Sequence, residues 1–353
     1  MAAKYLLLAA ELRRRCALLR REGETRLPGE LRLCAETGYS RQTVRRALEL
    51  LEREGLIVRA HGSGTYLADS APVRSGRVAA VLPSVDTYLY PRLLRDAESV
   101  LREAGCTLEA YTTGGLVSRE REVLTRLLAD PPAGLLIEAA KSALPSVNLD
   151  LFEQLGRRGV PLVWVYAPLP VPAGAPCFQD DNEGGARQLV RRLRERGHEH
   201  VAGIFRSDDR QGHERYLGFA AALLGCGLPL YEERILWFDT RERAAILRGE
   251  SGLLERFAAD LRPCTAVVCH NDEIAYALIR CLLRAGQRVP EDTAVVSFDN
   301  SHLCTLSPVP ITSLAHEKHQ MGTAAAKALL CMIQGQKAAG ARLPWTLRER
   351  RSG

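Results

Sequence analysis

The apolar pattern at the start of the chain predicts three helices. Residues 5–21 and 31–36 have helical patterns, and Ser40 is a good N-cap for a third helix that ends near Arg53. The apolar stripe of this third helix has spacings of i, i+3, i+4 and i+7 and consists of Val44, Ala47, Leu48 and Leu51. One side of the helix therefore packs on a core, and the other side is polar.

A pair of short strands is expected after the third helix. Residues 56–58 and 65–67 are strand-like and flank a glycine-containing turn at 61–64. The order of helix, helix, turn, helix and hairpin is typical of a winged helix-turn-helix, which we place at residues 1–68. The following residues, 69–77, are polar and rich in turn formers, so we expect a linker there.

From residue 78 onward, short apolar runs alternate with helical stretches. The predicted strands are 78–82, 134–137, 161–165, 201–205, 266–269 and 294–298. Strands that alternate with helices form βαβ units and parallel sheets. We therefore expect an α/β domain over residues 78–353, with a ligand site beyond the carboxyl ends of its strands.

Composition and charge agree with this two-part arrangement. With 353 residues, 46% of them apolar and 25% charged, the chain is long enough for two or three globular units. Residues 1–70 hold 13 Lys and Arg against 9 Asp and Glu, which is +4 of the net +6. A basic N-terminal unit suits a polyanion such as DNA, although basic helix faces also occur on proteins that bind no nucleic acid.

Cysteine usage and hydropathy indicate a cytoplasmic protein. The ten cysteines include no Cys-x-x-Cys pair and have no histidines at zinc spacing, so we expect reduced thiols and no metal site. The apolar patch 5–10 runs directly into charged residues and is much shorter than the roughly 20 apolar residues that cross a membrane. We therefore expect neither a signal peptide nor membrane association.

The third predicted helix carries side chains suited to reading DNA. A recognition helix needs donors on one exposed face near its N-terminus, where they reach base edges in the major groove. Arg41, Gln42 and Arg45 meet this requirement, since positions 41 and 45 lie one helical turn apart. The turn at 61–64 is placed to approach the phosphate backbone. Each feature alone is also compatible with a solvated helix face or an ordinary hairpin turn.

Together these segments resemble the GntR family of regulators. The matching motifs are Leu27-Pro28-Gly29-Glu30, Ser40-Arg41-Gln42-Thr43-Val44-Arg45-Arg46-Ala47-Leu48 and His61-Gly62-Ser63-Gly64-Thr65. The resemblance covers residues 4–68 and implies that double-stranded operator DNA is bound by Arg32, Ser40, Arg41, Gln42, Thr43, Arg45, His61 and Gly62. The family usually has an arginine at the position of Leu31, and Arg32 beside it is the candidate substitute.

Polar residues near the strand ends of the α/β domain are candidates for binding a sugar. Such a site needs carboxylates, amides and guanidinium groups that bridge neighbouring hydroxyls. The candidates are Glu138 and Lys141 after strand 134–137, Asp181 before a helix, Arg215 beyond strand 201–205, Asp272 after strand 266–269 and Asp299 after strand 294–298. Asp181 and Asp272 are equally compatible with helix N-caps.

The α/β domain resembles the lac and galactose repressor family, which has the two-lobed fold of periplasmic sugar-binding proteins. The matching stretches are 181–185, 194–198, 215–219, 271–275 and 296–300, within residues 77–335. In that family the Arg of Arg-x-x-Gly and the Asp of Asn-Asp contact the ligand. The resemblance therefore implies ligand contacts for Arg215 and Asp272.

The combination of a GntR-type head with this domain resembles the arabinose repressors of Gram-positive bacteria. Residues 137–143, 202–212 and 314–318 match as well, which adds His316 to the effector-binding candidates. The resemblance implies a homodimeric repressor that leaves its operator when a sugar, L-arabinose foremost, binds. His270 stands where an aromatic residue commonly precedes Asn-Asp, so another sugar remains an alternative, as does an activator or corepressor-dependent regulator.

Two other classes of protein fit the sequence less well. An enzyme on an α/β sheet would need a phosphate-binding motif, and neither G-x-x-x-x-G-K-[ST] nor G-x-G-x-x-G follows a predicted strand. A transport-associated sugar-binding protein would leave residues 1–68 without a purpose. We therefore expect a regulator with no catalytic residues and no cofactor besides its small-molecule effector.

Overall fold

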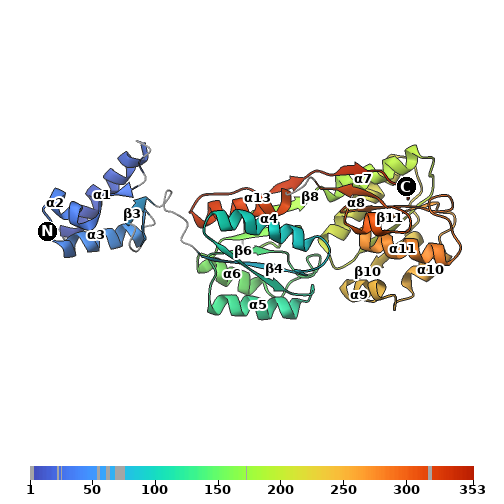
Figure 1. The fold of residues 1–353 in the computed structure, drawn as a ribbon, viewed down its shortest axis with the longest axis horizontal. Coiled ribbons are helices and arrows are strands. Elements are labelled where there is room, and N and C mark those ends of the chain that lie inside the picture. The colour runs from blue at the N-terminus through green and yellow to red at the C-terminus, as the bar shows by residue number, and fades with distance from the viewer. Residues whose placement is uncertain are drawn as a thin grey trace.

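The computed structural model describes residues 4–21, 24, 26–53, 56–60, 64–67, 76–171, 173–316 and 320–353, the side chains of residues 17, 20, 21, 53 and 60 excepted. Three bodies follow one another in Figure 1: a head formed by residues 4–67, a first lobe and a second lobe. Lobe 1 consists of residues 76–180 and 320–343, and lobe 2 of residues 182–315 and 346–353. Most of the predicted linker, residues 69–75, lies outside the described residues.

The head is a winged helix-turn-helix. Its elements are α1 (Lys4–Arg21), β1 (Arg26–Leu27), α2 (Glu30–Thr37), α3 (Arg41–Arg53), β2 (Ile57–Ala60) and β3 (Gly64–Leu67). The predicted apolar stripe of α3 is fully buried against α1 and α2. Strand β1 was not predicted, and it pairs with β3 to make a three-stranded sheet of order β1-β3-β2. Gly64 adopts a φ of +126° at the start of β3, a conformation that favours glycine.

Lobe 1 is a parallel six-stranded sheet covered by helices on both faces. Its elements are β4 (Arg77–Leu82), α4 (Tyr90–Glu103), β5 (Thr107–Thr112), α5 (Val117–Ala129), β6 (Gly134–Ile137), α6 (Leu149–Arg157), β7 (Leu162–Val165), β8 (Cys177–Asp180), α13 (Gln320–Ile333) and β14 (Ala341–Leu343). The strand order is β14-β8-β7-β6-β4-β5. An apolar core lies on each face of this sheet, and successive residues of β4 point into alternate cores. Val78 packs with α4 and α13 on one face, and Ala79 packs with α5 and α6 on the other.

Lobe 2 repeats this architecture with one antiparallel edge strand. Its elements are α7 (Asn182–Glu195), β9 (Val201–Arg206), α8 (Arg210–Gly225), η2 (Glu232–Arg234), β10 (Ile235–Phe238), α9 (Thr240–Arg248), α10 (Leu253–Ala259), β11 (Ala266–Cys269), α11 (Asp272–Arg284), β12 (Ala294–Phe298), α12 (Leu303–Leu306), β13 (Thr312–Ala315) and β15 (Thr346–Arg348). The strand order is β10-β9-β11-β12-β13-β15. Helices α7 and α8 cover one face, and α9, α10 and α11 cover the other.

The chain passes between the lobes three times, and these crossings form the hinge. They run from β8 to α7, from β13 to α13 and from β14 to β15. In lobe 1 the crossings lie at the β14 and β8 edge of the sheet, and in lobe 2 at the β13 and β15 edge. The opposite edges, which carry β5 and β10, are therefore remote from the hinge.

The structure confirms all six strands predicted for the α/β domain. Strand β4 begins at Arg77, one residue earlier than expected, and the Arg77 side chain is held by Glu109 at 3.2 Å and by Asp130 at 2.7 Å. In the described ranges, the helices are all too short or too polar to span a lipid bilayer.

Candidate functional site

The exposed face of α3 carries the residues predicted to read DNA. Arg41 and Gln42 are exposed in its first turn, and Arg45 follows one turn later with a side chain that is 67% exposed. The Ser40 hydroxyl accepts the backbone N–H of Thr43 at 3.3 Å and lies 2.9 Å from its hydroxyl. This contact confirms that Ser40 caps the helix, and it orders the turn from which Arg41 projects.

The basic side chains predicted to contact DNA on α2 and α3 are exposed and pair with carboxylates of the head. Arg41 lies 3.5 Å from Glu30, and Arg45 lies 3.5 Å from Glu49. On α2, Arg32 is 76% exposed and pairs with Glu36 at 2.8 Å. Exposed pairs of this kind contribute little to stability, so DNA phosphates can replace these carboxylates at little cost.

Three further positions of the head bear on DNA binding: His61, Gly62 and Leu31. His61 and Gly62 lie outside the described residues. Leu31, at the position where the GntR family usually has an arginine, is 74% exposed in the first turn of α2. Its neighbour Arg32 is also exposed, so both side chains are accessible to DNA.

A cleft of about 750 Å³, counting the space open to solvent, lies between the two lobes. Lobe 1 contributes Pro83, Ser84, Tyr88, Leu89, Tyr90, Gly114, Gly115, Glu138 and Tyr166. Lobe 2 contributes Arg206, Asp209, Gln211, Arg215, Thr240, Arg243, His270, Asn271, Glu273 and Asp299. Five of these residues, Pro83, Glu138, Tyr166, His270 and Asp299, follow a strand directly, as expected for ligand sites at the carboxyl ends of parallel sheets. The cleft therefore brings together Glu138 and Arg215, two of the predicted effector-binding residues.

Arg215 is the most extensively bonded side chain of the cleft. It projects from α8 and is 2% exposed. It donates hydrogen bonds to α7, to its own helix and to the residues that follow β11 and β12. The acceptors are Asn182 Oδ1 at 2.9 Å, Gln211 Oε1 at 3.2 Å, Asp299 Oδ1 at 3.3 Å and the His270 carbonyl oxygen. Its guanidinium carbon also lies 4.3 Å from the ring centroid of Phe298. These contacts fix the position of Arg215 before any ligand arrives.

Glu138 is a buried carboxyl group with unused hydrogen-bonding capacity. It follows β6, is 6% exposed, and its Oε2 has no hydrogen-bond partner among the described residues. Burial, reinforced by the charge of Asp209, raises the pKa of Glu138 to about 8, although the charge of Arg206 and a hydrogen bond from Tyr90 oppose the rise. An acceptor of this kind facing a cleft is suited to a ligand hydroxyl.

Asp272, predicted to contact the ligand, instead lies behind the wall of the cleft. It is 0% exposed, and its carboxylate accepts hydrogen bonds from the Ser297 hydroxyl, the Ser313 hydroxyl at 2.7 Å and the Ser301 amide at 2.6 Å. Burial raises the pKa of Asp272 to about 6. The residue before it, Asn271, both lines the cleft and caps α11. Asp272 therefore joins strands within lobe 2.

Asp181 and His316 lie at the hinge. Asp181 caps α7 by accepting the Gly184 amide at 3.2 Å, which is the alternative that its sequence position allowed. His316 follows β13, and its Nδ1 lies 3.3 Å from Asp180 Oδ1 while its ring centroid lies 4.0 Å from that of Trp345. His316 lines a second, smaller cavity next to the cleft.

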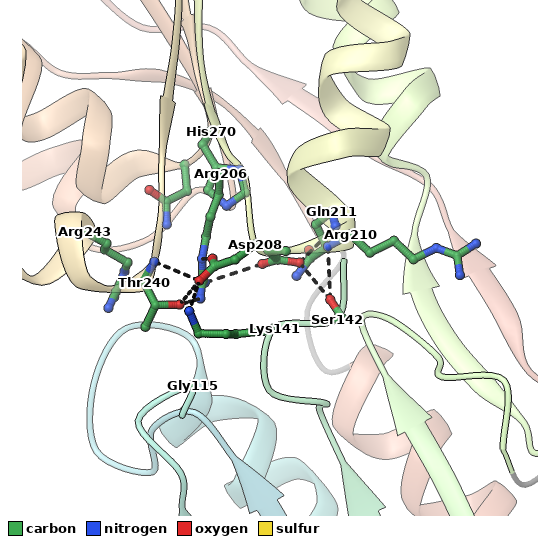
Figure 2. A network of polar contacts seen from close by, with 12 residues as sticks. Gly115, Lys141, Ser142, Arg206, Asp208, Arg210, Gln211, Thr240, Arg243 and His270 are labelled. Carbon is green, nitrogen blue, oxygen red and sulfur yellow. Dashed lines mark hydrogen bonds and ion pairs between the residues drawn. The ribbon is translucent and has the colours of Figure 1, made fainter. Parts of the chain in front are cut away.

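Lys141 contacts the opposite lobe. Its Nζ lies 3.0 Å from Asp208 Oδ2 in lobe 2, and Figure 2 shows the side chain directed at that carboxylate. Lys141 thus lies outside the lining of the cleft, although Glu138 in the same loop belongs to it.

Sequence reasoning missed several residues of the cleft wall. Arg206 is the last residue of β9, so it could have been found by the strand-end rule, which places ligand-binding residues at the carboxyl ends of parallel strands. Its side chain donates hydrogen bonds to Asp208 at 3.0 Å and to Thr240 at 2.7 Å. Three tyrosines of lobe 1, Tyr88, Tyr90 and Tyr166, belong to no recognisable motif. Tyr88 donates to Asp299 Oδ2 at 2.5 Å and so connects the lobes.

The charges of the cleft wall favour a neutral polar ligand. Each of its three guanidinium groups already faces a carboxylate of the same wall. The pairs are Arg206 with Asp209 at 3.5 Å, Arg215 with Asp299 at 3.3 Å and Arg243 with Glu273 at 2.6 Å. A phosphorylated ligand would have to compete with these carboxylates, whereas hydroxyl groups can donate to them and accept from the guanidinium groups.

Comparison with known proteins extends these observations to the whole chain. The model of bacterial regulatory proteins of the gntR family matches residues 4–67, and the model of the periplasmic binding protein-like domain matches residues 190–353. The chain is 33% identical to the arabinose metabolism transcriptional repressor of Geobacillus stearothermophilus, over 94% of this chain and 91% of that protein. It is 32% identical to the repressor of the same description from Halalkalibacterium halodurans, over 88% and 84%.

A solved structure matches nearly the whole chain. The transcriptional regulator CelR–cellobiose complex is 26% identical, has a TM-score of 0.67, and is matched over 93% of this chain and 100% of its own. Head, cleft and comparisons together define a sugar-responsive, DNA-binding transcriptional regulator. The chain belongs to the family of repressors with a GntR-type head and a periplasmic-binding-protein-like domain, which includes the two arabinose metabolism repressors. It is a regulator and not an enzyme, as the sequence predicted.

Proposed function

We propose that this chain represses genes for the use of a pentose, L-arabinose foremost, and leaves its operator when the sugar binds between the lobes. Two relatives that align with most of the chain are arabinose metabolism repressors. We also propose that it acts in the cytoplasm as a homodimer, because the symmetry of such repressors mirrors the two half-sites of an operator.

The observation that carries the proposal is the pairing of a DNA-reading head with a cleft built for hydroxyl groups. Glu138 offers a buried acceptor, and Arg215 offers donors held in place by four acceptors. The tyrosines of lobe 1 add apolar ring surface that suits the C–H face of a sugar. We assign direct sugar contacts to Glu138 and Arg215, and supporting roles in cleft or hinge to Lys141, Asp181, Asp272 and His316.

For the head, we assign base contacts to the exposed side chains in the first turns of α3. Arg41, Gln42 and Arg45 are placed for the major groove. Phosphate contacts are assigned to Arg32, Ser40, Thr43, His61 and Gly62, which flank that face or belong to the wing motif.

Calorimetry with a panel of sugars tests the ligand assignment. We expect the full chain to bind L-arabinose more tightly than D-xylose, D-galactose or cellobiose. Glu138→Gln should weaken binding at pH 8 by roughly tenfold, because hydrogen bonds to a charged acceptor contribute about 1.5 kcal/mol or more. Glu153→Gln, an exposed carboxylate change on α6, is the control and should leave binding unchanged. Tighter binding of another sugar would reject L-arabinose as the effector. Unaltered sugar binding by Glu138→Gln would reject the cleft as the sugar-binding site.

A further inference from the structure

A second set of polar contacts joins the two lobes beside the sugar cleft, and Lys141, Ser142 and Asp208 of this set do not line the cleft, whereas Asp209 does. Lys141 Nζ pairs with Asp208 Oδ2 at 3.0 Å, and the Ser142 hydroxyl donates to Asp209 Oδ1 at 3.3 Å. The same hydroxyl accepts the Arg210 amide at 3.0 Å, and the Ala143 amide donates to the Asp208 carbonyl oxygen at 3.4 Å. Figure 2 shows the loop of lobe 1 below and the loop of lobe 2 above. These residues, 141–143 and 208–210, are called the interlobe latch.

The latch lies away from the hinge. In lobe 1 its loop follows β6, a central strand separated by β7 from the crossings at β8 and β14. In lobe 2 its loop follows β9, which lies beside the edge strand β10 and is separated by β11 and β12 from the crossings at β13 and β15. Nearby, Gly115 after β5 faces Thr240 after β10, where a Cβ at Gly115 would lie 3.3 Å from the threonine methyl carbon. Because lobes that rotate about a hinge separate wherever they face each other away from it, opening of the cleft must break the latch.

The lobe 2 half of the latch is rigid and negatively charged. The Asp208 side chain is 4% exposed and accepts from Arg206 Nε at 3.0 Å, from the Thr240 hydroxyl at 2.6 Å and from the Thr240 amide at 3.0 Å. Burial opposes ionisation, but the Arg206 charge and the hydrogen bonds of Thr240 and Lys141 lower the pKa of Asp208 to about 2. Asp208 therefore presents a permanent charge to Lys141 near neutral pH.

The lobe 1 half is held in an unusual backbone conformation. Lys141 has a φ of +52°, in the left-handed region that side-chain-bearing residues rarely adopt. Such conformations persist where surrounding contacts enforce them, and they gather at switch regions. The Lys141 carbonyl oxygen accepts the Leu144 amide at 2.9 Å, which closes the turn and directs the lysine across the cleft edge.

We propose that the Lys141–Asp208 pair is a latch that sets how long the cleft stays closed, and hence how long a sugar stays bound, without contacting the sugar. The proposal rests on the function proposed above. Lys141 is a positioning residue in this scheme, because it stabilises the closed arrangement in which Glu138 and Arg215 face the same space. A latch that does not touch the ligand stabilises the closed state equally for every sugar.

Hydrogen exchange of the sugar-free full chain tests the latch independently of the ligand. In Lys141→Met we expect the peptide that contains residues 208–212 to exchange about fivefold faster, as for the loss of a partly buried ion pair of roughly 1 kcal/mol. The hinge-side peptide around Asp181, whose amide donates to the Leu343 carbonyl oxygen at 2.9 Å, should not change. Lys327→Met on α13, an exposed lysine, is the matched control. Unchanged exchange at 208–212 in Lys141→Met would overturn the latch.

Sugar kinetics then separate a latch from a direct ligand contact. In Lys141→Met and in Asp208→Asn, we expect L-arabinose to dissociate about fivefold faster while its association rate changes less than about twofold. The double variant should be no worse than Asp208→Asn, since both changes break one interaction. The factor should be the same for every other sugar of the panel that binds. A loss that varies with single hydroxyls would instead make Lys141 a ligand contact, and absence of any sugar binding by the unaltered chain would reject the proposed function while the exchange result stands.

Discussion

Replacing Glu138 with glutamine should stabilise the sugar-free protein. The Glu138 carboxyl is 6% exposed, its pKa rises from the ordinary 4.5 to about 8, and the groups that face it are Asp209, Arg206, Tyr90 and Asp180. Glutamine has nearly the same shape and carries no charge, so it imitates the protonated acid that the fold prefers. The expected stabilisation reflects a site arranged for its ligand rather than for the stability of the empty protein.

The magnitude follows from the difference in proton binding between folded and unfolded chains. Between pH 4.5 and 7 the folded protein keeps a proton on Glu138 that the unfolded chain has lost, so the free energy of unfolding falls as pH rises. At about 1.36 kcal/mol per pH unit, the cost at pH 7 is at most about 3 kcal/mol. It grows until about pH 8, where the folded protein also loses the proton. Glu138→Gln removes this cost.

Urea denaturation at several pH values measures the effect. We expect Glu138→Gln to be equal in stability to the unaltered chain near pH 4.5, and more stable by an amount that increases through pH 7. Glu153→Gln, at an exposed position, should show no such trend. A destabilised Glu138→Gln, or a difference that does not depend on pH, would show that the folded protein does not hold a proton on Glu138 near neutral pH.

The same group should couple sugar binding to proton release. Hydroxyl donors stabilise the carboxylate form of Glu138, so sugar affinity should rise as pH increases from about 6 to 8 and then level off. Calorimetry in two buffers of different ionisation enthalpy would show fewer than one proton released per sugar at pH 7, and none with Glu138→Gln. A pH-independent affinity in the unaltered chain would show that the sugar does not use Glu138.

Two further predictions concern the head and lobe 2. Arg45→Ala should lower operator affinity at fixed salt by at least about fivefold, because it removes a major-groove donor, while sugar affinity measured by calorimetry stays the same. A smaller change would remove Arg45 from the DNA-reading face. Asp272→Ala should lower the free energy of unfolding of the protein by about 3 kcal/mol in urea, because three buried donors lose their acceptor. If this variant is stable and loses only sugar affinity, Asp272 contacts the ligand after all.

The fold could be predicted where burial imposes a clear period on the sequence. The stripe of α3 and the continuous apolar run of β4 are buried as expected. Strands β5, β8, β10 and β13 were not predicted. Of these, β5 lies at a sheet edge, is mostly exposed and alternates little in sequence. Strand β14 joins the sheet of lobe 1, and the next strand, β15, joins the sheet of lobe 2. These pairings join residues distant in sequence, so a local pattern does not contain them.

The site could be predicted in position but only partly in detail. Glu138 follows its strand directly and faces the cleft, as the strand-end rule predicts. Asp272 also follows a strand, but serines from β12 and β13 bind its carboxylate on the core side. Sequence cannot distinguish these two directions, because they depend on which side chains neighbouring strands supply. Tyr88 and Tyr166 lie in the cleft wall and themselves have positive φ, and no sequence motif predicts these positions.

Release of operator DNA by sugar is the direct test of whether this chain is a sugar-controlled repressor. The measurement is fluorescence anisotropy of the full chain on a duplex operator selected from random DNA, titrated with L-arabinose at constant salt. We expect L-arabinose to lower operator affinity at least about tenfold, a coupling of roughly 1.4 kcal/mol, and Glu138→Gln to need more sugar for the same release. Operator affinity that stays constant or rises at saturating L-arabinose would show that this chain is not a repressor released by L-arabinose.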